Sequence, residues 1–315
     1  MAEWLFEAGI GEARAALVED GAILQARIEL DETFPRLGAV LAARLIDITV
    51  KGREGRVRFE GGEAMLAPLP PGITQGAALT VEITREAVRE AGRDKLPRAI
   101  PAEGPPRAAP TLLERISAGP LPVRTCLPHQ SDAFEAAGWS EVLEEAIGGD
   151  IAFPGGALRM IPTPAMTLFD VDGSGPLEPL AVAAAHAVAA AIVRHDIGGS
   201  IGVDFPTIAG KGPRQAVAEA IDAGLPQPFE RTAVNGFGFL QIIRKRSRES
   251  LPELLRADPA ATRARALLRA IERTPPPVPA LHHVSPAIHA ALAARPHWRD
   301  ALARRTGADI RFEVR

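Results

Sequence analysis

Two aspartates in the middle of the chain directly follow apolar runs and are candidates for binding a cation. Asp170 comes after Met166 to Phe169, and Asp204 comes after Ile201 to Val203. Acids at the carboxyl ends of adjacent parallel strands, which lie about 4.8 Å apart, point into the crevice where α/β sheets bind ligands. Two carboxylates at neighbouring strand ends can therefore share one Mg²⁺, a hard cation that prefers oxygen ligands. The alternative is that each acid caps the helix following its strand.

Asp172 is a third acidic candidate because it stands two residues after Asp170. If the strand continues, the side chains of Asp170 and Asp172 lie on one face of it. The sequence therefore predicts Asp172 as an additional metal ligand.

A second group of candidate residues is basic and could bind a phosphate backbone. The planar guanidinium of arginine suits phosphate oxygens. The alternative is that these side chains only solvate the surface, or pair with Glu249 and Glu253. The candidates are Arg244, Lys245, Arg246 and Arg248, which follow a predicted strand, together with Lys211.

Charge is distributed unevenly along the chain, although the net charge is only −3. Fifteen Lys/Arg and seven Asp/Glu lie between Arg244 and the last residue, so this part is basic and the rest is acidic. Such a division is compatible with a polyanionic partner, but charge alone favours the alternative of an arginine-rich solvated surface. A single cysteine, Cys126, excludes an internal disulfide and a zinc site built from several cysteines of one chain.

Neither a leader nor a membrane span is expected from the sequence. Residues 1–14 contain Glu3 and Glu7 and lack the basic start of a signal peptide. The longest apolar run, Leu180 to Val193, is too short to cross a bilayer. We therefore expect a cytoplasmic protein with no membrane partner.

The first half of the chain predicts a small β-rich part. Residues 14–30 form two short strands around Asp20-Gly21, a strong hairpin signal. Residues 38–84 continue as short strands between Gly and Pro clusters, which is typical of a small antiparallel barrel. The Pro-rich residues 97–128 indicate a linker.

The second half alternates predicted strands and helices. Helices are expected over 132–147, 179–194 and 213–223, and strands over ALRMI, AMTLFDVD, SIGVDF and GFGFLQIIRKR. This order favours an α/β layout with a largely parallel sheet. The tail predicts helices over 259–273 and around 286–304, followed by the strand DIRFEVR.

Three segments resemble the ribonuclease E/G family. GGDIAFPGGALRMIPTPAMTLFDVDG is similar to its catalytic segment, and the spacing from Gly155 to Asp170 matches without a gap. RHDIGGSIGVDF matches at Asp196, Gly198, Gly199, Asp204 and Phe205, and NGFGFLQIIRKRSRESL matches at Phe237, Gly238 and Arg244.

The resemblance implies a fold and a division of the chain. The fold class is α/β (α+β), with an RNase H-like/DNase I-like catalytic core and an inserted OB-type small β-barrel. Residues 1–35 are then the opening strands of the core and 36–96 the RNA-binding barrel. Residues 97–130 are a linker with a reduced sensor region, and 131–315 hold the catalytic core and C-terminal helices. The resemblance also implies Mg²⁺ on Asp170 and Asp204, with Asp172 where the family has an asparagine.

The chain departs from the family in ways that bear on activity. The helix between the aspartates has Ala183 where the family has a glutamate, and Thr207 replaces an acid after the second aspartate. The family's C-x-x-C zinc link is absent, so no zinc-linked dimer is expected. Arg124-Thr125 is all that resembles the family's 5′-monophosphate sensor.

Two functions from the same resemblance, and one unrelated to it, stay open at this point. The first is a Mg²⁺-dependent endoribonuclease that cleaves RNA phosphodiesters. The second is an RNA-binding relative that has lost efficient cleavage, which the missing glutamate favours. The third is an α/β protein of unrelated function.

Overall fold

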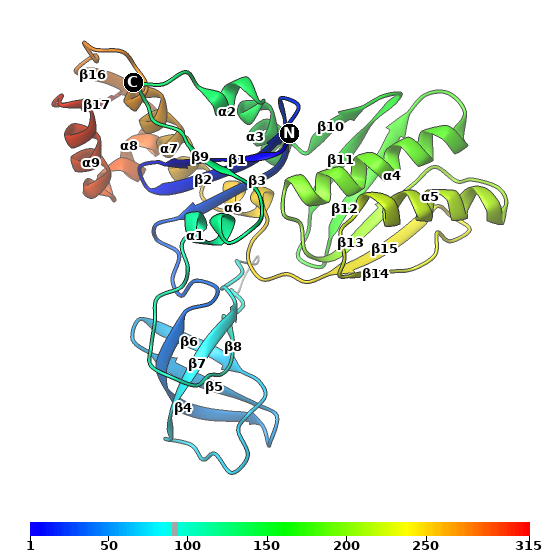
Figure 1. The fold of residues 1–315 in the computed structure, drawn as a ribbon, viewed down its shortest axis with the longest axis horizontal. Helices are drawn as coiled ribbons and strands as arrows, with labels where there is room; N and C mark the ends of the chain where they lie inside the picture. Colours follow the sequence, from blue (N-terminus) through cyan, green and yellow to red (C-terminus); the bar gives the residue numbers. More distant parts are fainter. Residues whose placement is uncertain (90–93) are drawn as a thin grey trace. The chain divides into compact units, whose positions relative to one another are not determined.

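The computed structural model describes residues 1–89 and 94–315 and has a mixed α/β fold. Residues 90–93, which fall inside the barrel predicted over 36–96, lie outside the described residues. The chain divides into two compact units, each made of segments far apart in sequence (Figure 1). Unit 1 comprises Met1–Glu32, Ile116–Ile147 and Leu254–Arg315, and unit 2 comprises Thr33–Arg115 and Gly148–Glu253.

Unit 1 is built on a four-stranded sheet with the order β3-β2-β1-β9. The predicted hairpin is confirmed, because β2 and β3 are antiparallel around Asp20 and Gly21, which have φ values of 50° and 79°. Two positive φ values are what a type I′ turn requires. The strands are β1 (Glu3–Ala8), β2 (Glu12–Glu19), β3 (Ala22–Leu30) and β9 (Val123–Thr125).

Short helices and one parallel strand pair complete unit 1. Two helices start where the sequence places a cap followed by proline: Asp258 accepts from the Ala261 N–H, and Ser285 from the Ile288 N–H. The single helix predicted around 286–304 is instead two, because Pro296 starts a new helix. The elements are α2 (Ala133–Ala136), α3 (Trp139–Gly148), α7 (Pro259–Glu272), α8 (Pro286–Ala293), α9 (Pro296–Thr306), β16 (Leu281–Val284) and β17 (Arg311–Val314).

A buried ion-pair network joins β1 and β2 to helix α7 within unit 1. The Glu7 carboxylate accepts from Arg14, from Arg269 at 2.8 Å and from Arg273 at 3.3 Å. The Glu12 carboxylate pairs with Arg14 at 2.7 Å and with Arg265 at 2.6 Å. Glu7, Glu12, Arg14 and Arg265 are all buried, so each charge depends on its partners.

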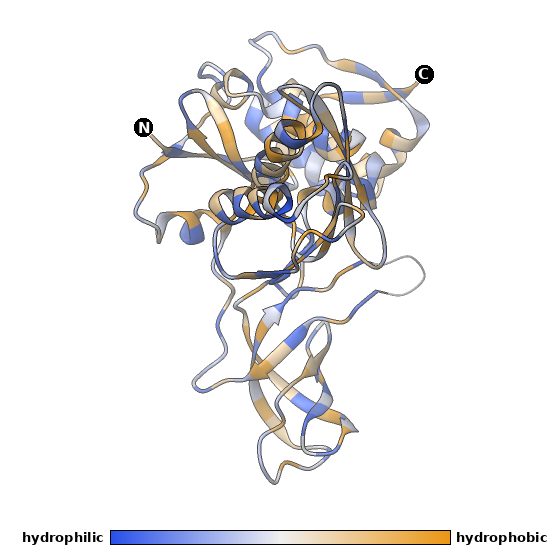
Figure 2. Ribbon diagram, turned by 90° about the vertical axis from the view of Figure 1, so that its right-hand side faces the viewer, coloured by the Kyte–Doolittle hydropathy of each residue, from blue (hydrophilic) through white to orange (hydrophobic). Residues whose placement is uncertain are grey.

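The first part of unit 2 is a closed five-stranded barrel with the order β4-β5-β6-β8-β7. Its strands carry alternating hydrophobic and hydrophilic bands (Figure 2), and the inward residues Leu45, Val57, Leu66 and Ile83 form its core. β6 and β8 pair in parallel and the other neighbours are antiparallel. The strands are β4 (Val40–Val50), β5 (Glu54–Phe59), β6 (Gly62–Leu66), β7 (Ala78–Arg85) and β8 (Arg98–Pro101).

The segment predicted as a linker over 97–130 contains regular structure. β8 is the fifth barrel strand, so the barrel extends past the boundary expected at residue 96. Helix α1 (Leu112–Ser117) and strand β9, which pairs with β1, follow in the same segment. Its prolines are compatible with this arrangement because they stand between the elements or at a strand end.

The second part of unit 2 is a six-stranded sheet with the order β10-β11-β12-β13-β15-β14. The prediction of a largely parallel sheet is wrong, because β12 and β13 are the one parallel pair among these strands. Short turns after β10 and β11 reverse the chain, and a short turn joins antiparallel strands only. The strands are β10 (Asp150–Phe153), β11 (Gly156–Pro162), β12 (Thr167–Gly173), β13 (Gly199–Asp204), β14 (Phe229–Arg231) and β15 (Phe239–Arg244).

Helices α4 (Leu177–Arg194) and α5 (Lys211–Gly224) cover one face of this sheet (Figure 1). Their apolar residues pack on Phe169, Val203 and Leu240, which point from the sheet into the same core. Helix α4 has 18 residues and a mean hydropathy of 1.5, so by length and composition it could cross a membrane. Several of its apolar residues, among them Ala184, Val188 and Ile192, are buried in this core. The remaining helix, α6 (Leu251–Ala257), follows the basic run.

Candidate functional site

The sheet face opposite α4 and α5 carries the predicted acidic residues. Side chains alternate along a strand, so Phe169 and Val203 point into the helix-covered core while Asp170 and Asp204 point to the other face. We call this second side the open face. Asp170 and Asp204 are both exposed on it.

Asp170 and Asp204 belong to a row of side chains that crosses the open face. Each residue is the direct register partner of the next on the neighbouring strand, so all of them share one face. Asp170 and Asp204 are partners across the parallel pair β12–β13. We name this set the cross-sheet row: Asp150, Arg159, Asp170, Asp204 and Phe239.

The Asp170 and Asp204 carboxylates are available to a ligand. Within residues 1–89 and 94–315, no hydrogen bond or ion pair engages either carboxylate. Arg159, the neighbour of Asp170 in the row, donates instead to Asp150 at 2.9 Å, and both members of that pair are largely exposed. The centre of the row therefore presents two adjacent, unneutralised negative charges.

Asp172 does not join this pair in the same way. It lies on the open face, but its register partner is Ala157, so it is two residues further along β12 than the row. Its Oδ1 accepts a hydrogen bond from the Gly173 N–H at 2.8 Å. Asp172 is thus placed as a neighbour of the pair and not as a member of the row.

The two central carboxylates fit the donor set of a magnesium ion. Mg²⁺ is commonly held by one or two carboxylates and keeps several waters. Among the described residues, no cluster of three or more His, Cys, Asp or Glu side chains could hold a metal ion. Any cation here would therefore rest on Asp170 and Asp204 and complete its coordination with water or substrate oxygens.

An apolar floor lies beside the carboxylates on the open face. Gly202 precedes Asp204 by two residues, and a side chain on it would meet the Phe239 ring at 2.7 Å and Leu168 at 2.8 Å. The absence of a side chain at Gly202 therefore lets Phe239 and Leu168 close over the strand. Further from Asp204, Ile161 and Ile243 extend the apolar surface and are 44% and 48% exposed.

The turn before β15 reaches the end of β13, next to Asp204. Asn235 Oδ1 accepts from the backbone N–H of Phe237 at 2.9 Å and of Phe239 at 3.0 Å. The Gly238 carbonyl accepts from the Phe205 N–H at 3.2 Å. Gly238 has φ +95°, and a Cβ there would lie 2.2 Å from the Phe205 carbonyl oxygen, so this close approach requires glycine.

The basic run lies at the opposite end of β15 from the carboxylates. Arg244 pairs with Gly199 at the start of β13, whereas Phe239 pairs with Asp204 at its end. Those two ends of β13 are separated by about 16 Å at ~3.3 Å per residue. The structure therefore does not bring the run and the acidic pair together.

Most of the run already contacts protein groups. Arg246 pairs with Glu253 at 2.6 Å, which is one of the ion pairs that the surface alternative predicted. Glu249, the other predicted partner, pairs with Arg89. Arg248 pairs with Asp196 at 2.9 Å, and Arg244 donates to the Ile197 carbonyl at 3.1 Å. Lys245 is exposed.

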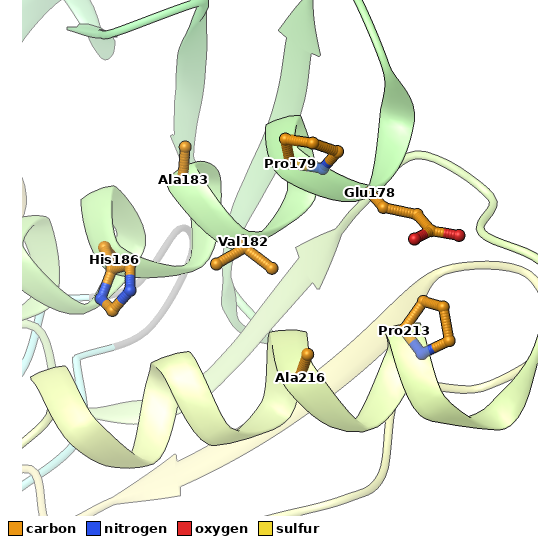
Figure 3. Close-up of a pocket in the computed structure, with 7 residues that line it drawn as sticks. All are labelled: Glu178, Pro179, Val182, Ala183, His186, Pro213 and Ala216. Carbon is orange, nitrogen blue, oxygen red and sulfur yellow. The ribbon is translucent and has the colours of Figure 1, made fainter.

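The remaining predicted residues belong to the helix layer. Lys211 is exposed at the start of α5, after the loop that leaves Asp204. Ala183, where the resemblance predicts a glutamate, lines an apolar groove between α4 and α5 with Val182 and Ala216 (Figure 3). A glutamate at position 183 would lie on the helix layer and not on the open face. Having alanine there therefore removes no group from the cross-sheet row.

Three side chains near the acidic pair were missed from the sequence. Arg159 lies inside a predicted strand and carried no signal until the register placed it beside Asp170. Phe237 and Phe239 had no role of their own in the prediction from sequence. Phe239 is the register partner of Asp204, and the Phe237 carbonyl accepts from Thr207, three residues after Asp204. An alternation count along β11 and β15 would have assigned Arg159 and Phe239 to the open face, but not to the same row.

The chain was compared with protein-family models and with curated proteins. No protein-family model matches the chain, and no curated protein matches it in sequence.

Proposed function

We propose that this protein is a Mg²⁺-dependent endoribonuclease whose reaction centre is the Asp170–Asp204 pair. The observation that carries the proposal is the direct register of the two exposed, unpartnered carboxylates on the open face. The resemblance to the ribonuclease E/G family, which rests on Asp170, Asp204 and the segments around them, supplies the substrate class. The RNase H-like core is part of the same proposal.

The side chains of the row suit a phosphodiester substrate. Asp170 and Asp204 would hold the cation, and a bound Mg²⁺ supplies a water of lowered pKa and a counter-charge for phosphate oxygens. Arg159 stands on the next strand from Asp170 with a largely exposed guanidinium. Its planar fork can donate two hydrogen bonds to a phosphate group, in exchange for the solvent-exposed pair with Asp150.

The barrel supports an RNA substrate as well. Its order, in which the third and fifth strands pair in parallel and the first pairs with the fourth, agrees with an OB-type barrel. Such barrels bind oligonucleotides on the face of strands two and three. The cytoplasmic location expected from the sequence belongs to this proposal and stays a prediction.

The second candidate is an RNA-binding relative without efficient cleavage. The observation that favours it is that no third acidic side chain joins Asp170 and Asp204 among the described residues. Both candidates bind RNA, but only the first cleaves it, and that cleavage depends on the metal ion.

End-labelled RNA incubated with the purified protein separates the two candidates. We expect fragments with Mg²⁺, none with EDTA, and a loss on the order of 100-fold or more in rate for Asp204→Asn, because one of two metal ligands is removed. Asp150→Asn is the matched control, since Asp150 lies in the same row but outside the pair. Binding without cleavage would favour the second candidate, and equal cleavage by Asp204→Asn would exclude the proposed centre.

A further inference from the structure

Phe237 is an aromatic side chain that the fold leaves in solvent. It is 84% exposed, more than any other large hydrophobic residue of the described chain except Met1. Phe239, two residues later, packs its ring over Gly202. Phe239 therefore packs on the sheet, whereas Phe237 does not contribute to a hydrophobic core.

The backbone that carries Phe237 is held by hydrogen bonds on both sides. Its N–H donates to Asn235 Oδ1 at 2.9 Å, and its carbonyl accepts from Thr207 Oγ1 at 3.3 Å. The next residue, Gly238, is tied to Phe205. The turn thus keeps its shape without help from the Phe237 ring, and the ring is presented from a fixed position.

That position is at the end of β13 that carries Asp204. Gly238 accepts from Phe205, the residue after Asp204, and Thr207, which bonds to Phe237, lies three residues after Asp204. The neighbours of Phe237 in this turn are polar or small, and Asn235, Gly236 and Thr207 are all exposed. An isolated ring with a polar rim suits one flat ligand group better than an extended apolar protein surface.

We infer that Phe237 stacks against a base of single-stranded RNA and so positions the nucleotide next to the phosphate held at Asp170 and Asp204. The inference rests on the proposed function for its ligand class. Every base offers a π-face, so such a contact is tolerant of sequence and demands an unpaired base. Phe237 is here a positioning residue, since it touches the base and not the reacting atoms.

Binding measured apart from cleavage tests the inference. A short fluorescent single-stranded RNA and an abasic strand of equal length are titrated with the protein in Ca²⁺, and a gel verifies that the probe stays intact. We expect Phe237→Ala to weaken RNA binding on the order of tenfold and to leave the abasic strand unchanged, because the contact is made to a base. Ile243→Ala, on the same face but remote from Asp204, is the matched control.

A second variant gives a direct signal of stacking. Phe237→Trp should restore affinity for RNA, and its added fluorescence should be quenched by RNA but not by the abasic strand. If the wild type does not cleave RNA but Phe237→Ala binds it tenfold more weakly, the stacking contact is supported and the proposed reaction is contradicted. Equal RNA binding by wild type and Phe237→Ala would overturn the inference, as would a dimer that disappears in Phe237→Ala with RNA affinity unchanged. No RNA binding by the wild type would overturn both claims.

Discussion

Asp170 and Asp204 are direct register partners across the one parallel strand pair of the six-stranded sheet. Parallel partners share a face, so the two side chains leave neighbouring strands on the same side, where the strands lie about 4.8 Å apart. Arg159 precedes them in the same row and Phe239 follows. This order places the acidic pair, which we propose to hold a cation, between Arg159, which we propose to contact phosphate, and an apolar floor.

The turn beside Asp204 depends on glycine at position 238. Gly238→Ala places a Cβ 2.2 Å from the Phe205 carbonyl oxygen at φ +95°. We expect a loss of about 1–3 kcal/mol in unfolding free energy, together with slower RNA cleavage, because the turn must move. Urea unfolding and the cleavage assay measure the two effects. Gly236→Ala is the control, since nothing lies within 4 Å of its would-be side chain, and equal behaviour of the two variants would refute the prediction.

Within unit 1, the buried ion-pair network should contribute more to the free energy of unfolding than the exposed ion pairs do. Glu7→Ala removes the shared acceptor of the buried Arg14 and the half-buried Arg269 and Arg273. We expect a loss of about 3–5 kcal/mol in unfolding free energy. Glu3→Ala, on the same strand, breaks an exposed pair with Arg124 and should cost less than about 1 kcal/mol. Similar losses for the two variants would contradict this account.

Asp132 should make the protein sensitive to acid. Burial raises the pKa of its carboxyl, but hydrogen bonds from Arg269 and the Glu135 N–H, with the charges of Arg269 and Arg273, outweigh burial and lower the pKa below its ordinary value. A lowered folded-state pKa adds stability above the unfolded pKa of about 3.9, and this stability disappears as the pH falls through the folded pKa.

Asp132→Asn tests that dependence, because asparagine can still cap α2 through the Glu135 N–H. We expect the variant to be less stable than the wild type by a constant amount between pH 5 and pH 7. The difference should shrink below about pH 4, as urea unfolding at each pH would record. A difference that stays constant down to pH 2 would show that ionised Asp132 is not responsible.

The exposed lysines and the paired arginines should differ in their effect on RNA binding. Lys211→Ala with Lys245→Ala should weaken binding of all single-stranded RNAs and flatten the salt dependence by about 0.7 for each phosphate that is no longer neutralised. Arg246→Ala with Arg248→Ala should mainly lower stability, because these side chains pair with Glu253 and Asp196. A salt slope flattened more by the arginine pair would support the sequence-based prediction that the arginines contact RNA.

Local signals in the sequence were sufficient for the elements but not for their pairing. Asp20-Gly21 predicted its hairpin, and the apolar runs before Asp170 and Asp204 predicted their strands, because turn preference and periodicity are properties of neighbouring residues. The direction of β11 and the division at Pro296 were not anticipated. Direction depends on how the chain returns after each short turn, which alternating strands and helices do not reveal.

For the site too, the sequence indicated single residues but not which of them lie together. Asp170 and Asp204 could be singled out because both follow apolar runs, whereas Arg159 and Phe237 became candidates only through register and exposure. The basic run leaves the same strand that passes Asp204, and the sequence did not show at which end of that strand the acids lie. Its position at the other end of β15 follows from the antiparallel pairing with β13, which is a tertiary property.

The most direct test of the account is the binding of Mn²⁺, as a paramagnetic substitute for Mg²⁺, followed by electron paramagnetic resonance. We predict one bound ion per chain for the wild type, with binding weakened at least about tenfold in Asp170→Asn and in Asp204→Asn. Asp172→Asn and Asp150→Asn should bind nearly as the wild type does, because neither belongs to the in-register pair. Unchanged Mn²⁺ binding in Asp170→Asn and Asp204→Asn would contradict the central claim that these two carboxylates hold the cation.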